Sequence, residues 1–136
     1  MNNNLIKIGK CTIIQYMEEK ELFLKLNKSK FRSQFKLDEK DLNYIHIHGL
    51  LKIKQHAYDF INERIRVYNS LKDGKQTPFK GHVVFKAQHA TATCCRGCIE
   101  KWHHFAKEIT LNDKEVDYLV DIIMYWIEKE YLSHIK

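Results

Sequence analysis

Proline and glycine are scarce in this chain, because 136 residues contain one proline and five glycines. Turn-rich all-β folds need many residues of these two kinds, so their scarcity favours long helices. No run approaches the ~18 apolar residues that a membrane-spanning helix requires. The N-terminus lacks the apolar core and the small-residue cleavage site of a signal peptide. We therefore expect a cytoplasmic protein with no membrane segment.

Cysteine is also sparse, with four residues, and the chain does not need them merely to fold. A length of 136 residues predicts one domain, which can bury a core without disulfides or a structural metal. The hydrophobic fraction of 44% and the charged fraction of 29% are typical of an ordinary soluble domain. Without an export signal, the cysteines are expected to be reduced thiols or metal ligands.

Basic residues exceed acidic ones and give a formal net charge of +6 at pH 7, which permits a polyanionic partner such as nucleic acid. The densest basic segment is 28–36, where cations surround Phe31 and Phe35. These rings are four residues apart and share one face of a helical turn. The alternative is that the rings anchor the segment to the core while the lysines are solvated. The candidate nucleic-acid contacts are Lys28, Lys30, Arg32 and Lys36.

The expected fold is mainly α, and α+β at most, with about five helices. Residues 1–16 are rich in β-branched side chains and predict an N-terminal extension or a short strand. A single helical domain is expected over 17–136. A further strand or extended segment is expected at 82–88. The sequence contains neither an internal repeat nor a domain linker.

Two helices in the first half have recognisable signals. Asp38 followed by Asp41 predicts a capped helix that runs to His48 and stops at Gly49. Apolar residues at three- and four-residue spacing over 50–65 predict a second helix with one buried stripe.

The last helix has the clearest pattern. Apolar residues recur at helical spacing from Val116 to Ile127 and predict a stripe that packs on the core. Its start is expected at one of two capping pairs, Thr110 with Asp113 or Asn112 with Glu115.

The reactive side chains are concentrated in residues 82–104, which hold three of the four cysteines and four of the eight histidines. Thiolate and imidazole groups bind soft and borderline metals, and imidazoles transfer protons near neutral pH. Cys95 and Cys98 form a C-x-x-C pair that can share one metal at the start of a helix. The predicted zinc ligands are His89, Cys95, Cys98 and His103, with Cys94 and His82 in reserve.

Helix geometry restricts this ligand set. In a regular helix over 95–105, Trp102 rather than His103 lies above Cys98, because four residues bring the chain almost full circle. His103 can therefore join the cysteines only if the cluster begins in a loop, which Gly97 permits.

Three familiar cysteine motifs do not fit. A c-type haem site requires a histidine directly after the second cysteine, and position 99 is Ile. A zinc deaminase requires H-x-E and a proline before C-x-x-C, and this segment has neither. A thioredoxin-like redox pair belongs to an α/β fold, which the mostly helical pattern disfavours.

Metal-free chemistry is the main alternative at this segment. A helix N-terminus and the neighbouring Arg96 would lower the pKa of a cysteine, and His89 or His103 could act as its base. The candidate catalytic residues of such a hydrolase or nuclease are His89, Arg96 and His103. In a third interpretation, the cysteines are inert core residues.

Four segments together resemble a small family from bacteria and their mobile elements, a domain of unknown function. They are 28–37, 55–61, 74–103 and 115–128, and the resemblance covers about residues 20–130. The family usually continues its KWH motif with glycine and often proline, whereas His104 follows here, so the resemblance supports no role for His104. The matching motif positions are His82, Gln88, His89, Thr91, Thr93, Cys94, Cys95, Arg96, Cys98, Trp102 and His103.

The leading hypothesis is a small cytoplasmic metal-binding domain, with zinc, that engages nucleic acid through its basic surface. The alternatives are the hydrolase or nuclease above, and a mobile-element (phage) inhibitor that binds a host defence protein. The resemblance implies no particular activity, and the sequence sets no oligomeric state.

Overall fold

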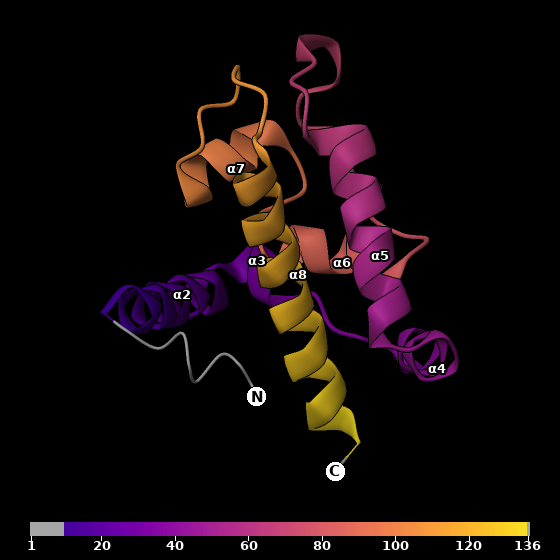
Figure 1. Ribbon diagram of the computed structural model, residues 1–136. Coiled ribbons are helices and arrows are strands. Elements are labelled where there is room, and N and C mark those ends of the chain that lie inside the picture. Colours follow the sequence, from indigo (N-terminus) through magenta and orange to yellow (C-terminus); the bar gives the residue numbers. More distant parts are fainter. Residues whose placement is uncertain (1–9, 136) are drawn as a thin grey trace.

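All regular secondary structure in residues 10–135 is helical, as expected from the composition (Figure 1). The structure is a computed structural model that describes the backbone of residues 10–135 and the side chains of residues 17–135. This part contains seven α-helices, with a π-helical turn at Ile61–Ile65 and a 3₁₀ turn at Ser70–Lys72. The α-helices are α2 (Lys10–Lys28), α3 (Lys30–Ser33), α4 (Glu39–His48), α5 (Leu50–Phe60), α6 (Val83–Ala90), α7 (Arg96–His103) and α8 (Asp113–His134).

The strand expected at 82–88 is wrong, because this segment forms α6. Short apolar runs do not distinguish a buried strand from a buried helix. Here Val83, Val84 and most of the residues after them are buried, and no strand exists among the described residues to pair with this segment. His82 caps the helix by accepting a hydrogen bond from the backbone N–H of Val84.

The strand expected within residues 1–16 is wrong from residue 10 onward. Residues 10–16 form the beginning of α2, and residues 1–9 lie outside the described residues. Extending a formed helix costs little, since each added residue makes one hydrogen bond for each pair of dihedrals it fixes. The helical pattern after Met17 therefore prevails over the β-branched residues before it.

The predicted helix ends are confirmed. Asp38 and Asp41 form a reciprocal capping box at the start of α4, and Gly49 ends that helix with φ of 83°. Of the two pairs expected at the last helix, Asn112 and Glu115 form the cap. Each box satisfies two backbone N–H groups that no helical carbonyl can reach.

The long C-terminal helix α8 is the centre of the packing. It lies across the middle of Figure 1 and packs against α5 and α6. The main core between these helices is aliphatic, and Ile53, Ile61, Leu119 and Ile123 are fully buried in it. A smaller apolar cluster joins α2, α7 and α8 through Phe23, Leu26, Ala92 and Ile122, with Cys98 and Trp102 packed against it.

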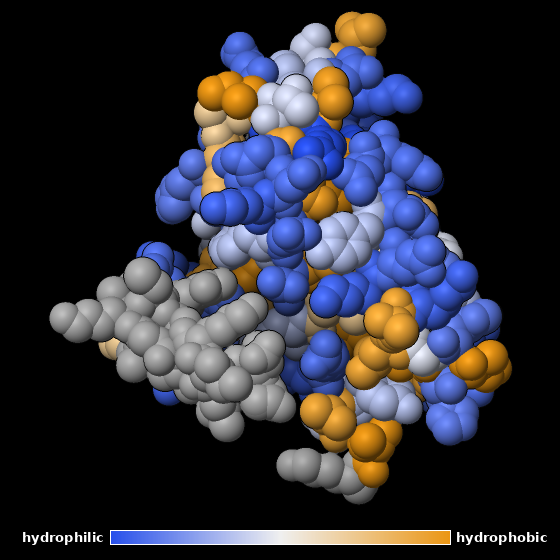
Figure 2. Space-filling view, viewed as in Figure 1, coloured by the Kyte–Doolittle hydropathy of each residue, from blue (hydrophilic) through white to orange (hydrophobic). Residues whose placement is uncertain are grey.

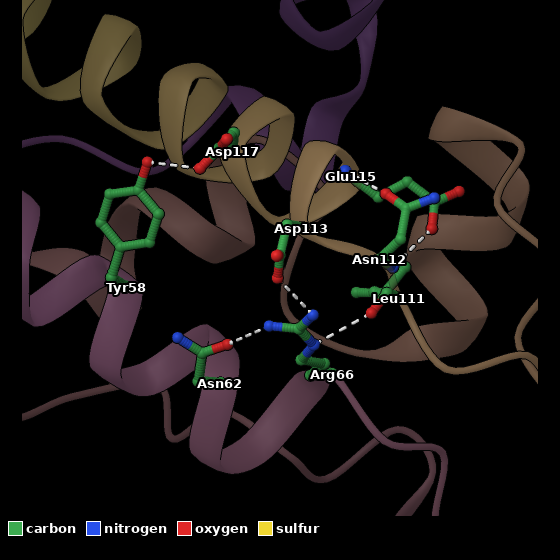
Figure 3. A network of polar contacts seen from close by, with 8 residues as sticks. All are labelled: Tyr58, Asn62, Arg66, Leu111, Asn112, Asp113, Glu115 and Asp117. Atoms are coloured by element: carbon green, nitrogen blue, oxygen red, sulfur yellow. Dashed lines mark hydrogen bonds and ion pairs between the residues drawn. The ribbon is translucent and has the colours of Figure 1, made fainter.

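Polar contacts fix the start of α8 against the end of α5 (Figure 3). Arg66 donates to the Leu111 carbonyl at 2.9 Å, to Asn62 at 3.0 Å and to Asp113 at 2.6 Å. Tyr58 adds a hydrogen bond of 2.7 Å to Asp117, one turn further along α8. These bonds link the start of α8 to α5 and to the π-helical turn that follows α5.

No helix in the described residues is long and apolar enough to cross a membrane. On the face shown in Figure 2, hydrophilic residues cover most of the surface and hydrophobic ones are scattered between them.

Candidate metal centre

The loop between α6 and α7 brings three cysteines together. Cys95 is the N-cap of α7, and its Sγ accepts a hydrogen bond from the backbone N–H of Cys98 at 3.4 Å. Ala92, earlier in the loop, is fully buried and adopts a left-handed conformation with φ of 61°, which is unusual for a residue other than glycine. The chain therefore turns back sharply after α6, and this turn places Cys94 beside the start of α7.

The Sγ atoms of Cys94, Cys95 and Cys98 lie within 4.8 Å of one another. Cys94 and Cys95 are buried, and Cys98 is partly buried. Three sulfurs at this separation match a soft ligand set for one metal ion. The structure thus joins Cys95 and Cys98 with Cys94, and we name these three residues the cysteine cluster.

A buried arginine from α3 is the direct partner of the cysteine cluster. The guanidinium of Arg32 donates to Cys98 Sγ at 3.1 Å, to Cys94 Sγ at 3.5 Å and to the carbonyl of His89 at 2.8 Å. Arg32 is 9% exposed. It therefore faces the sulfurs rather than the solvent, unlike the lysines with which sequence analysis grouped it.

The neighbouring thiols, and then the arginine, favour ionisation of Cys98 over the other two cysteines. Hydrogen bonds from Cys94 and Cys95, and then from Arg32, lower the pKa of Cys98 to about 2. The pKa of Cys94 is raised by its hydrogen bonds to Cys95 and Cys98 and by burial. For Cys95, the hydrogen bond to Cys94 lowers the pKa, but Cys98 and burial raise it on balance. The hydrogen bonds within the cluster therefore favour ionisation at Cys98 over ionisation at Cys94 or Cys95.

The two predicted histidine ligands do not join the cysteine cluster. His89 Nε2 lies 3.2 Å from the carbonyls of both Thr77 and Pro78. His103 Nε2 lies 2.9 Å from the Thr91 carbonyl, and its Nδ1 lies 3.0 Å from the hydroxyl of Tyr118. Burial lowers the pKa of both histidines, to about 4 for His103. Each imidazole holds the backbone beside the cluster.

His82, the reserve ligand, belongs to a separate group at the other end of α6. Its Nδ1 accepts from the Val84 N–H at 3.0 Å, so the proton of the neutral ring is on Nε2. Nε2 lies 3.0 Å from Nδ1 of His56 and 3.3 Å from the hydroxyl of Tyr44. We name His56, His82 and Tyr44 the histidine cluster. Burial, followed by repulsion from His56, lowers the pKa of His82 to about 4.

Arg96 is fully buried and binds backbone rather than an open site. Its guanidinium donates to the carbonyls of Arg66 at 3.0 Å, Ala106 at 2.9 Å and Ile109 at 2.9 Å. It therefore holds the loop after α7 against the end of the π-helical turn. His89 and His103 are buried as well. None of the three catalytic candidates predicted from the sequence therefore faces solvent.

The predicted basic segment divides into two parts. Lys28, Lys30 and Lys36 are exposed, as a nucleic-acid contact requires, whereas Arg32 is turned inward. The link between Arg32 and the sulfurs was not predicted. A signal was available, because Arg32 is the one arginine among the cations of 28–36, and arginine is favoured over lysine for buried charge pairs.

Fold and site together define a small helical domain with a three-cysteine cluster that could hold a metal ion. The family described as a domain of unknown function, DUF4186, matches residues 20–128. The chain belongs to this family, and the resemblance seen in its motifs is confirmed. No solved structure matches the chain.

Proposed function

We propose that the protein is a small metal-binding domain that holds zinc on Cys94, Cys95 and Cys98 and engages nucleic acid through its basic surface. The observation that carries the metal half is the convergence of three Sγ atoms within 4.8 Å beside the guanidinium of Arg32. Three thiolate ligands leave one position of a tetrahedral zinc ion for a ligand from outside the cluster.

Charge balance is compatible with a metal on the cysteine cluster. Arg32 supplies one positive charge, which offsets the thiolate of Cys98, while Cys94 and Cys95 remain protonated because their pKa values are raised. A divalent cation would deprotonate these two thiols as it bound them. The resulting three thiolates and one zinc carry a net charge of −1, which Arg32 neutralises.

Metal content tests the first half of the proposal. Purified protein is expected to contain about one equivalent of zinc per chain, by elemental analysis. Cys95→Ser and Cys98→Ser should each lose most of it. Cys11→Ser is the matched control, because it removes the remaining cysteine, which lies outside the proposed ligand set and whose side chain lies outside the described residues. A folded protein without metal would overturn this half of the proposal.

The nucleic-acid half is supported by the net charge of +6 and by the exposed lysines at 28, 30 and 36. Lysine contacts to phosphates release counterions, so affinity should fall steeply as salt rises. Lys30→Ala and Lys36→Ala should each reduce the slope of log affinity against log salt by about 1 in a fluorescence anisotropy titration. Lys52→Ala, on the exposed side of α5, is the control. If neither substitution changes the affinity or its salt dependence, the assignment of this surface is wrong.

Thiol catalysis is a second candidate, and the observation that favours it is the thiolate of Cys98 held by Arg32. A partly exposed cysteine that is ionised at neutral pH is a nucleophile. Metal-free protein should then react with iodoacetamide at pH 5 as fast as at pH 8, at Cys98 only, as read by mass spectrometry. A rate that rises with pH through about 8.5, the ordinary cysteine value, would reject this candidate.

A further inference from the structure

Three aromatic rings form a nearly parallel stack that ends at the protein surface. Phe35 stacks on one side of His89, with ring centroids 5.6 Å apart and planes 17° apart. Phe79 stacks on His89 at 4.3 Å and 13°. Phe35 and His89 are largely covered, whereas the side chain of Phe79 is 60% exposed. Phe79 is therefore the open end of the stack.

The exposed ring packs against both His89 and Phe31. Its buried partner, His89, forms hydrogen bonds through Nε2 to the carbonyls of Thr77 and Pro78, the two residues before Phe79. The carbonyl of His89 in turn accepts from Arg32 at 2.8 Å. Phe31, 44% exposed, meets Phe79 edge-on with centroids 6.4 Å apart. An exposed ring that is already ordered loses little conformational entropy when a ligand stacks on it.

Lysines flank these rings in the sequence, and others line the same cavity. Lys30, Lys36 and Lys80 neighbour Phe31, Phe35 and Phe79 in the sequence, and all three are exposed. Phe35 and Phe79 also line a cavity of about 660 Å³ together with Lys40, Lys80 and Lys86. Lys86 is already paired with Asp41 and Asp38, so Lys40 and Lys80 are the cavity cations that, within the described residues, have no ion pair.

We infer that Phe79 is a stacking platform for a base of single-stranded nucleic acid, with Lys80 and Lys40 placed to contact the flanking phosphates. This inference rests on the nucleic-acid half of the proposed function and specifies its substrate class. Stacked bases on aromatic rings beside cations are the mode by which proteins bind single strands without reading sequence. A duplex keeps its bases stacked on one another, so it offers no ring face to Phe79.

The test compares a fluorescein-labelled single strand of roughly 12 nucleotides, within the usual footprint of such sites, with a duplex of the same length. Phe79→Ala should weaken single-strand binding about tenfold, since stacking contributes about 1–3 kcal/mol per base. Duplex binding and the salt slope should stay unchanged. Leu51→Ala, which removes an 83% exposed apolar side chain from α5, is the matched control.

A second variant reports on the contact itself. Phe79→Trp preserves an aromatic platform, so it should keep the single-strand affinity, and a stacked base should quench the added tryptophan emission. Wild-type protein gives the background fluorescence of Trp102 and Trp126. Urea unfolding of Phe79→Ala checks that the fold is retained.

The outcomes separate the inference from the proposal beneath it. If the wild-type protein binds single strands and Phe79→Ala binds them equally well, the role of Phe79 is rejected. The proposed binding through the basic surface is then unaffected. Equal affinity for strand and duplex, or equal loss for both in Phe79→Ala, overturns the substrate class. Wild-type protein that binds neither at low salt overturns both, while the metal half is still decided by metal analysis.

Discussion

The cysteine cluster and the histidine cluster lie at opposite ends of α6. Both contain buried titratable groups, but their surroundings favour different charge states. At the C-terminal end, hydrogen bonds from Cys94 and Cys95, and then from Arg32, lower the pKa of Cys98. At the N-terminal end, burial keeps His82 neutral.

The difference explains which end can receive a cation. The sulfurs of the cysteine cluster converge, and each thiolate would keep lone pairs for a metal beside the hydrogen bond that it accepts. In the histidine cluster, the lone pair of His82 Nδ1 is used in capping α6, and its Nε2 proton points to His56. A metal on His82 would have to displace either the cap or the bond to His56. Proximity of potential ligands is thus not enough, because their lone pairs must also be free.

The largest effect is predicted for the loss of the Arg32 charge, which is present at the cysteine cluster and not at the histidine cluster. Arg32→Met should destabilise the protein by about 3 kcal/mol, because breaking a buried charged pair leaves the other charge uncompensated. Lys30→Met, two residues away on the same short helix but exposed, should change stability by less than about 0.5 kcal/mol. Urea unfolding measures both. Equal effects would show that Arg32 has no special partnership with the sulfurs.

In metal-free protein, acidification should act on His82 and His103. Their folded pKa values of about 4 lie below the ordinary 6.5, so the unfolded chain binds protons first as the pH falls. The stability that the neutral rings confer is complete above pH 6.5 and is lost progressively towards pH 4. Between pH 6.5 and 5 the loss should reach about 2 kcal/mol for buried His103, with less from partly exposed His82. Stability that rises over this interval would contradict the account.

His82 can be tested separately through its capping role. His82→Ala should cost about 1 kcal/mol, the usual price of a lost N-cap, whereas His82→Asn should recover most of it because asparagine also caps helices. His82→Asn should, in addition, remove the His82 share of the acid sensitivity and leave that of His103. The readout is the urea midpoint at pH 7 and pH 5. If asparagine fails to rescue, the bond to His56 matters more than the cap.

The smallest effect concerns the loop that supports the cysteine cluster. Asp73 accepts from the Gly97 N–H at 3.3 Å, at the start of α7, and pairs with Lys107 at 3.6 Å. Asp73→Asn should cost about 0.5 kcal/mol, since both contacts are near the surface. Zinc content should not change. Metal loss in this variant would mean that the cluster depends on loop charge rather than on Arg32.

Local signals in the sequence were sufficient for most helices. The capping pairs at Asp38 and Asn112 and the stripe on the last helix depend on neighbours three or four residues away, which a sequence displays directly. The segment 82–88 failed because buried helices and buried strands are both apolar on all sides, so the pattern has no period to read.

The site was predictable only in its local part. Cys95 and Cys98 are three residues apart, and Cys94 adjoins them, so their meeting follows from a loop and one helical turn. Arg32 comes from 66 residues before Cys98, a pairing that depends on how α3 packs on α6. His89 and His103 have the right chemistry for ligands, but backbone carbonyls occupy them, and a sequence does not show those partners.

The measurement that tests the central claim most directly is X-ray absorption at the zinc edge of purified protein, together with its zinc content. The account predicts one zinc per chain with three sulfur neighbours at about 2.3 Å, reduced in Cys98→Ser and unchanged in Cys11→Ser. A folded protein that contains no metal, or zinc bound without sulfur, would contradict it.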